Sequence, residues 1–311
     1  MGISKINSLA AASLAKANTV VKASINKINS VVASFAAAFT NNRAVSKSIT
    51  TGSGNAITIA ETNHFSFTQS DAFSIGFWIK VGWNNSLNTN IHFFAMNDGS
   101  STARNEQIRI FYNESNNRLE FRIGSDSSNR SLQFWALHSN LSVNGLAGSA
   151  ASQYWSSAST ANRGNVNGDN FTHLMITKGT GTTLAASNVA AYWNGNKMTN
   201  AFYASGNNFG TISMDASSVR RIALGSNAHT LEKSGNNNET VYNDLTIYNK
   251  QLSDAEVTAL YNSGTPIDAT TLSSAGNLRG YYTFEAGDGA DTGGTSGPTF
   301  TVSGDSSIIS V

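Results

Sequence analysis

The sequence contains no cysteine, which excludes disulfide bonds and thiolate metal sites. Proline occurs only twice against 27 glycines, so most turns must be formed by glycine and asparagine. Charged residues make up only 13% of the chain, about half of the usual share. Serine, threonine, asparagine and glycine must therefore supply most of the polar surface.

The chain also lacks a charge of dominant sign and any long apolar run. Its 20 basic and 19 acidic residues are interspersed, so the electrostatic attraction on which nucleic-acid binding depends is missing. No stretch approaches the ~18 apolar residues of a membrane-spanning helix, and we expect neither nucleic acid nor membrane insertion. A net charge of only +1 favours association with other proteins.

The first 42 residues carry an 11-residue repeat that the rest of the chain lacks. The sequence KINSL at 5–9 returns as KANTV at 16–20 and as KINSV at 27–31. In a helix this period gives about 3.67 residues per turn and places the apolar residues on one stripe. The stripe consists of Ile6, Leu9, Leu14, Val20, Ile25, Ile28, Val31 and Phe35, with Ala17 between them.

Helix and extended chain remain alternatives for this segment. Its many alanines favour helix, whereas Asn-Ser and Asn-Thr pairs favour turns between short strands. Under either interpretation so short a segment cannot bury its own apolar stripe, and we expect docking or oligomerisation through it. A disordered tail is the third alternative. We assign residues 1–42 to this segment and 43–311 to one folded domain.

The second region has the pattern of an all-β sandwich. Short apolar or β-branched runs alternate with glycine, asparagine and serine, as expected for many strands joined by turns. The predicted strands cover 56–59, 74–80, 91–96, 107–112, 118–123, 131–137, 172–177, 189–193, 221–224, 241–248 and 279–284. The stretch 139–169 interrupts this pattern and predicts a long loop, which in a compact domain is usually functional or disordered.

One short helix is predicted near 253–262. Ser253 and Glu256 have the spacing of a capping box, in which the serine accepts from a backbone amide and the glutamate bonds back to the cap. Val257, Leu260 and Tyr261 supply an apolar face. Gly264 and Pro266 follow, as is typical of a helix end.

Several segments together resemble laminin-G-like domains of the concanavalin A-like jelly-roll fold. The clearest is DLTIYNKQLSDAEVTALY at 244–261, which is similar to the closing strand and helix of that family. FSIGFWIK at 73–80, FTHLMIT at 171–177, VAAYWNG at 189–195 and LRGYYTFE at 278–285 follow the family's order. The resemblance covers about 44–290 and implies an antiparallel β-sandwich jelly roll, a fold that carries lectins, glucanases and adhesion modules alike.

The N-terminal repeats resemble the K-[IV]-N-G-V repeats of virion proteins from tailed bacteriophages, particularly marine ones, with serine or threonine in place of the glycine. This resemblance implies a virion structural protein: a fibre, head decoration or neck appendage. Its partners would then be other virion proteins and copies of itself. It would be made in the host cytoplasm and displayed on the particle surface.

Residue patterns of enzymes are missing. Glycan-cleaving members of the superfamily place carboxylates on one strand as E-x-D-x-x-E, and no such run occurs here. The nearest pair, Glu114 and Glu120, spans a hairpin turn and is interpreted as solvated charge. His173 falls in a predicted strand, where a packed histidine is expected, and no paired metal-binding histidines occur. We therefore predict no catalysis and no cofactor.

Two kinds of binding site are predicted. Loop carboxylates could bind calcium, as in some laminin-G-like domains, and the candidates are Asp98, Asp126 and Asp169. Sugars stack on exposed aromatic rings, and the candidates for glycan contact are Trp135, Tyr154 and Trp155. The alternative for these aromatics is that Trp135 belongs to the core and Trp155 anchors its loop.

We predict a virion structural protein displaying an attachment domain, with a carbohydrate-binding lectin module and a glycan depolymerase as alternatives.

Overall fold

The computed structural model describes much of the region after residue 41. The described residues are 42–47, 57–65, 67, 70–81, 91–97, 106–113, 118–123, 132–137, 171–181, 188–198, 201–203, 220–226, 240–304 and 306–310. They all belong to the unit Asn41–Val311. The repeat segment lies outside them, so its predicted docking residues stay a prediction. Among the described residues, no helix has the length and apolar character needed to cross a membrane.

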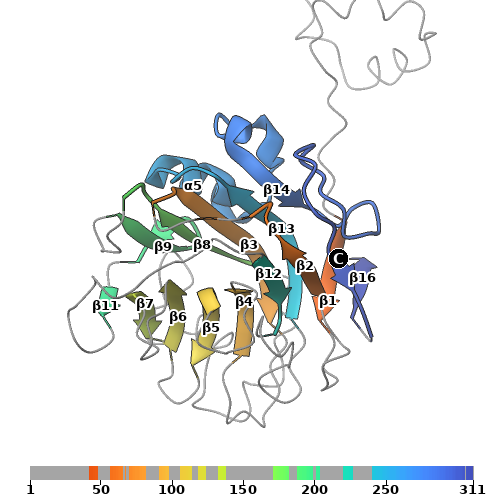
Figure 1. Ribbon diagram of the computed structural model, residues 1–311, viewed down its shortest axis with the longest axis horizontal. Helices are drawn as coiled ribbons and strands as arrows, with labels where there is room; N and C mark the ends of the chain where they lie inside the picture. The colour runs from red at the N-terminus through yellow and green to blue at the C-terminus, as the bar shows by residue number, and fades with distance from the viewer. Residues whose placement is uncertain are drawn as a thin grey trace, which may run out of the picture. The chain divides into compact units, whose positions relative to one another are not determined.

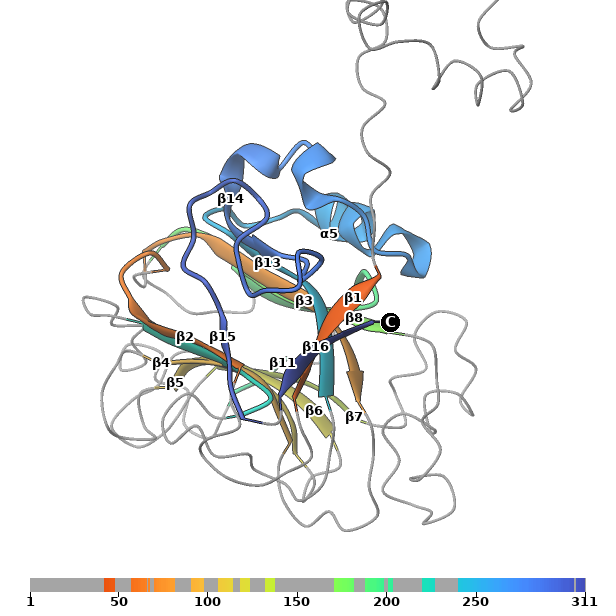
Figure 2. The same ribbon diagram turned by 90° about the vertical axis from the view of Figure 1, so that its right-hand side faces the viewer.

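Two antiparallel sheets form the sandwich, as predicted (Figures 1 and 2). The first sheet has the order β10 (Asn196–Lys197), β9 (Val189–Trp193), β8 (Thr172–Lys178), β3 (Phe73–Val81), β13 (Thr240–Tyr248), β1 (Arg43–Lys47) and β16 (Ser307–Ser310), and β14 (Leu278–Tyr282) also pairs with β13. The second sheet has the order β11 (Ala201–Tyr203), β7 (Leu132–Leu137), β6 (Arg118–Ile123), β5 (Glu106–Asn113), β4 (Ile91–Asn97), β12 (Arg220–Leu224), β2 (Ile57–Thr62) and β15 (Thr301–Val302).

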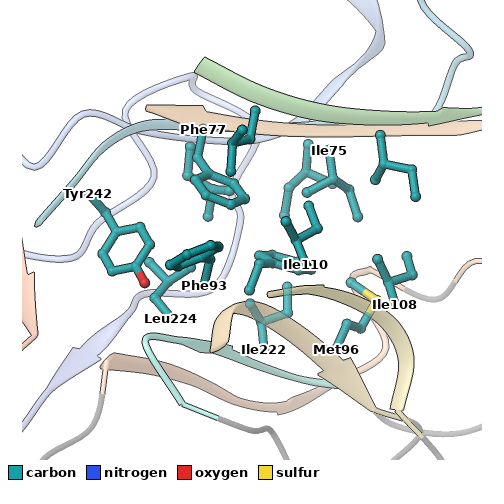
Figure 3. Packing of buried hydrophobic residues seen from close by; sticks show 14 of the residues in the cluster. Ile75, Phe77, Phe93, Met96, Ile108, Ile110, Ile222, Leu224 and Tyr242 are labelled. Atoms are coloured by element: carbon teal, nitrogen blue, oxygen red, sulfur yellow. The ribbon is translucent and has the colours of Figure 1, made fainter. Parts of the chain in front are cut away.

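The apolar residues that alternate along both sheets meet in one core. Ile75 and Phe77 of β3 face Ile108, Ile110 and other side chains of the second sheet (Figure 3). Phe77 and Phe94 stack with their ring centroids 6.0 Å apart. Because each large apolar side chain contributes roughly 1.5–3 kcal/mol on full burial, this layer supplies the main stabilisation of the sandwich.

Each predicted strand has a counterpart within one to three residues of its expected ends. The exceptions are strands that the sequence pattern did not reveal, namely β1, β10, β11, β15 and β16. Most of these are very short, and β16 consists of the residues Ser-Ile-Ile-Ser at a sheet edge. Such segments offer too few alternating residues to predict a strand, and only pairing with a neighbour defines them.

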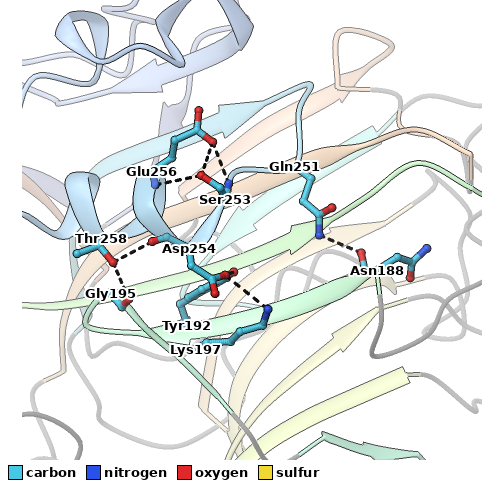
Figure 4. A network of polar contacts seen from close by, with 9 residues as sticks. All are labelled: Asn188, Tyr192, Gly195, Lys197, Gln251, Ser253, Asp254, Glu256 and Thr258. Carbon is cyan, nitrogen blue, oxygen red and sulfur yellow. Dashed lines mark hydrogen bonds and ion pairs between the residues drawn. The ribbon is translucent and has the colours of Figure 1, made fainter.

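The predicted helix is α5 (Asp254–Tyr261). Its capping box is present: the Glu256 amide donates to Ser253 Oγ, and the Ser253 amide donates to Glu256 Oε2 (Figure 4). The helix ends one turn before the expected glycine, because Asn262 already adopts the left-handed conformation with φ 44°. Short 3₁₀ turns follow at η5 (Asn262–Gly264), η6 (Ala269–Thr271) and η7 (Ala275–Asn277).

Helix α5 is bonded to the first sheet on the side away from the core. Tyr192 of β9 donates a hydrogen bond of 2.6 Å to Asp254, and Thr258 donates to the Gly195 carbonyl in the turn after β9 (Figure 4). Tyr261 stacks on Trp78 of β3 with a centroid distance of 5.8 Å. Helix α5 therefore occupies the outward face of the first sheet at β3 and β9.

Candidate functional site

The outer face of the second sheet, which points away from the core, carries a group of polar and aromatic side chains. In β6, Leu119, Phe121 and Ile123 belong to the core, so the alternate residues Glu120 and Arg122 belong to the outer face. The register extends this face to the neighbouring strands, because Arg109 is opposite Arg122, Phe111 is opposite Glu120, and His92 is opposite Phe111. We call His92, Arg109, Phe111, Glu120 and Arg122 the outer cluster.

Glu120 and Arg122 form an ion pair within the outer cluster. The Arg122 Nε and Nη2 groups both donate to Glu120 Oε2, at 2.8 and 2.6 Å. The side chain of Glu120 is fully buried, whereas that of Arg122 is 23% exposed. The interpretation of Glu120 as a solvated hairpin charge is therefore wrong, because strand alternation turns it onto a covered face beside an arginine rather than into water.

Phe111 is the centre of the outer cluster. The guanidinium carbon of Arg109 lies 4.5 Å from the centroid of the Phe111 ring, and that of Arg122 lies 4.8 Å from it. Cations are attracted to the electron-rich face of an aromatic ring, more strongly where water is excluded, and Phe111 is fully buried. Arg109 and Arg122 are directly opposite each other in the ladder, where like charges repel. The attraction of both guanidinium groups to the Phe111 ring offsets part of this repulsion.

His92 completes the outer cluster. Its ring stacks on Phe111 with a centroid distance of 5.6 Å, and the residue is 6% exposed. Burial, together with the positive charges of Arg109 and Arg122, lowers the pKa of His92 to about 3, so the imidazole is neutral at physiological pH. Its Nδ1 atom is buried and finds no hydrogen-bond partner within the described part of the chain.

Trp135, one of the three predicted glycan-contact residues, is directly opposite Glu120 in the ladder between β6 and β7. Residues directly opposite each other in an antiparallel pair lie on the same face. The backbone position of Trp135 therefore lies on the same face of the sheet as Glu120. The position next to it, Phe134, is opposite the core residue Phe121.

The other predicted site residues fall outside the part of the chain that the structure describes. Tyr154 and Trp155 lie outside the described residues, and so do the calcium candidates Asp98, Asp126 and Asp169. In the ranges that the structure does describe, no three histidine, aspartate or glutamate residues are grouped so that they could hold a metal ion.

His173 is packed, as predicted from its place in a strand. It is 2% exposed, lies against Trp78 with a centroid distance of 5.2 Å, and burial lowers its pKa to about 3. Such an imidazole is neutral and enclosed beneath helix α5. It serves packing of the first sheet and lies on the opposite side of the sandwich from the outer cluster.

Sequence reasoning did not identify His92, Arg109 or Arg122 as site residues. A signal was present: the alternation that identified the strands also predicts which residues of 107–112 and 118–123 turn away from the core. The neighbour relation between strands was also required, because His92 and Arg122 approach Phe111 from β4 and β6, on either side of β5.

The outer cluster can bind polar, planar groups. A guanidinium presents hydrogen-bond donors in a rigid plane that matches carboxylate, sulfate and phosphate oxygens, and a neutral imidazole can both donate and accept. The described side chains of this face include three arginines, Arg109, Arg122 and Arg221, and one carboxylate, Glu120.

A scan against protein-family models gives no match, and neither does a search of curated protein sequences. Solved structures do match. The binding domain of Paraclostridial Mosquitocidal Protein 1 is 18% identical, with a TM-score of 0.41, over 72% of this chain and 47% of that chain. The botulinum neurotoxin serotype G binding domain is 15% identical, with a TM-score of 0.40, over 66% and 39%.

A third solved structure is the binding domain of botulinum neurotoxin DC in complex with SialylT, 16% identical with a TM-score of 0.37. The match covers 63% of this chain and 36% of that chain. The chain thus spans less than half of each of these proteins. The resemblances to laminin-G-like domains and to phage virion repeats stay predictions from the sequence.

Proposed function

We propose that the protein is a non-enzymatic attachment protein whose β-sandwich binds carbohydrate on the outer face of the second sheet. The observation that carries this proposal is the ladder position of Trp135, directly opposite Glu120 and next to the outer cluster. Sugar rings present an apolar face that stacks on aromatic side chains and a rim of hydroxyls that needs hydrogen-bond partners. The outer cluster supplies these partners from arginine and neutral histidine.

Hydrolysis is not part of this proposal. Glycosidases need two carboxyl groups about 5–9.5 Å apart across the bond that they cleave. Glu120 is the one carboxylate whose side chain is described on this face, and Arg122 holds it in an ion pair. A single carboxyl group cannot act both as the acid and as the nucleophile or base of that reaction.

The glycan proposal is tested with the full chain on an array of microbial surface glycans. Trp135→Ala should abolish or strongly weaken binding and leave the melting temperature nearly unchanged. As a matched control, Tyr261→Ala removes an aromatic ring of helix α5, which stacks on Trp78 of the first sheet. The control should lower the melting temperature and leave glycan binding per folded molecule intact. A Trp135→Ala protein that melts much earlier but binds normally would contradict the proposal.

We further propose that the protein is a structural component of a phage particle, with the sandwich displayed on the virion surface and residues 1–42 as the docking segment. The support is the three-fold repeat at 5–9, 16–20 and 27–31, with its apolar stripe and its resemblance to phage virion repeats. Gold-labelled antibody against the sandwich should decorate intact particles at one defined location. Its absence from purified particles would refute this role.

A further inference from the structure

We propose that the ligand of the outer cluster is an acidic saccharide, whose carboxylate or sulfate group binds Arg122 and hydrogen-bonds to His92. The inference rests on the proposed function and names the class of glycan. It follows from three features of the outer cluster: a fixed guanidinium, an enclosed imidazole whose Nδ1 atom has no hydrogen-bond partner among the described residues, and two guanidinium groups on one ring.

Glu120 fixes the orientation of Arg122 and leaves part of it available. The guanidinium bonds Glu120 through Nε and Nη2, and the same carboxylate oxygen accepts both bonds. Nη1 has no partner among the described residues, while 23% of the side chain is exposed. Because Glu120 and the Phe111 ring together hold the guanidinium, little conformational entropy is lost when a ligand binds Nη1.

His92 supplies the second feature. A buried polar atom without a hydrogen bond costs about 1–3 kcal/mol, and such atoms usually have a partner in the functional state of a protein. The ring lies against Phe111, the same ring that carries both guanidinium groups, so a ligand at Arg122 comes within the reach of His92. Neutral imidazole keeps one N–H, which can donate to an anionic oxygen.

The charge distribution favours an anion over a neutral sugar. Arg109 and Arg122 occupy directly opposite positions in the ladder, and both lie within 5 Å of the centroid of Phe111, at 4.5 and 4.8 Å. Like charges at such positions repel, Glu120 offsets part of this repulsion, and a ligand's anionic oxygen at Arg122 would lower it further. Carboxylate and sulfate groups also match the planar donors of a guanidinium, which hydroxyl groups do less well.

Isothermal titration calorimetry of the full chain with three hexasaccharides tests the inference. One carries uronic acids, one carries sulfate groups, and maltohexaose is the neutral probe. We expect the better acidic ligand to bind at least ~10-fold more tightly than maltohexaose, and added salt to weaken that binding. A preference between the two acidic probes decides between carboxylate and sulfate.

Variants locate the site. Glu120→Gln combined with Arg122→Gln removes both charges of the ion pair together, so no buried charge is left unpaired. It should weaken acidic-glycan binding by about 10- to 100-fold and maltohexaose binding much less, so that the preference for the acidic ligand is lost. Arg279→Gln removes one exposed arginine from β14 of the first sheet and is the matched control, with no expected change.

The outcomes separate this inference from the proposed function. If neutral and acidic glycans bind equally well, the inference is wrong while the carbohydrate function stands. If acidic glycans are preferred but the folded double variant retains that preference, the anion binds elsewhere and the inference is overturned. If no glycan binds, including those on the array, the proposed function fails and the inference with it. Should the double variant not fold, Phe111→Leu provides the same test by removing the ring under both guanidiniums.

Discussion

The Tyr281 hydroxyl donates a hydrogen bond of 3.0 Å to Asp244 Oδ1, at the irregular position of β13 where the carboxyl group is buried between strand and loop. The pKa of Asp244 is raised to about 8, chiefly by burial and also by the nearby acidic groups Glu285 and Asp268, while the bond from Tyr281 works in the opposite direction. Asp244 is thus substantially protonated at neutral pH.

This relationship predicts that stability falls as the pH rises from about 4 to about 8. The folded-state pKa of Asp244 lies above its value in the unfolded chain, so the folded protein retains a proton that the unfolded chain loses between about pH 4 and 8. The free energy of unfolding should decrease over that range by at most about 1.4 kcal/mol per pH unit. Asp244→Asn should show a smaller decrease and exceed the wild type at pH 9 in urea titrations; parallel curves would contradict the assignment.

Asp291 organises the loop that follows β14. Its two oxygens accept from the backbone amides of Tyr281, Gly293, Thr295 and Gly297 at 2.9–3.1 Å, and also from the Thr295 hydroxyl. Burial works to raise the pKa of Asp291, but these hydrogen bonds outweigh it and hold the pKa below its usual value.

Asp291→Ala should therefore lower the free energy of unfolding by about 3 kcal/mol, since bonds to a charged acceptor contribute more than neutral ones. Asp288→Ala is the matched control in the same loop, because Asp288 is exposed and accepts from the Ala290 amide alone among the bonds described there. We expect a change below about 1 kcal/mol for the control, measured by chemical denaturation. Equal losses for both variants would show that the network does not hold the loop.

Asn194 and Gly195 form the turn after β9, and both residues have positive φ, 49° and 75°. A Cβ atom at Gly195 would lie 2.9 Å from Cδ1 of Tyr261 in helix α5. Gly195→Ala should reduce stability by about 1–3 kcal/mol through backbone strain and this contact. Gly276→Ala, where nothing lies within 4 Å, is the control and should change the melting temperature little. An unchanged melting temperature for Gly195→Ala would mean that helix α5 moves away from the added Cβ atom without loss of stability.

Docking through the repeat segment is tested by placing charge on its apolar stripe. Leu9→Asp combined with Ile25→Asp should lower the assembly mass in solution and prevent incorporation into particles, because buried carboxylates without partners are unfavourable. Ser8→Asp combined with Ser30→Asp adds the same charge on the side of the predicted helix opposite the apolar stripe. This control should assemble normally, as judged by mass photometry. Unchanged assembly of the first variant would rule out docking through these positions.

The sequence predicted those elements whose signals are local. In 118–123 strict alternation separates Leu119 and Phe121 from Glu120, and in 253–256 a serine and a glutamate three residues apart mark the helix start. Strands such as β16 were not predicted because only pairing defines them. Ile308 is in a strand because it lies opposite Val45, far away in the sequence.

By itself, then, the sequence determined the fold class, most strands, the capped helix and which residues of each strand share a face, because side-chain alternation is a property of the local backbone. The hairpin of β5 and β6 was also predicted, but only the tertiary structure decided that β4 pairs with β5 on its other side and that His92, Arg109 and Arg122 gather on Phe111. The physical reason is that backbone amides and carbonyls pair with any strand of suitable register. The choice of partner is made by the burial of all the side chains together.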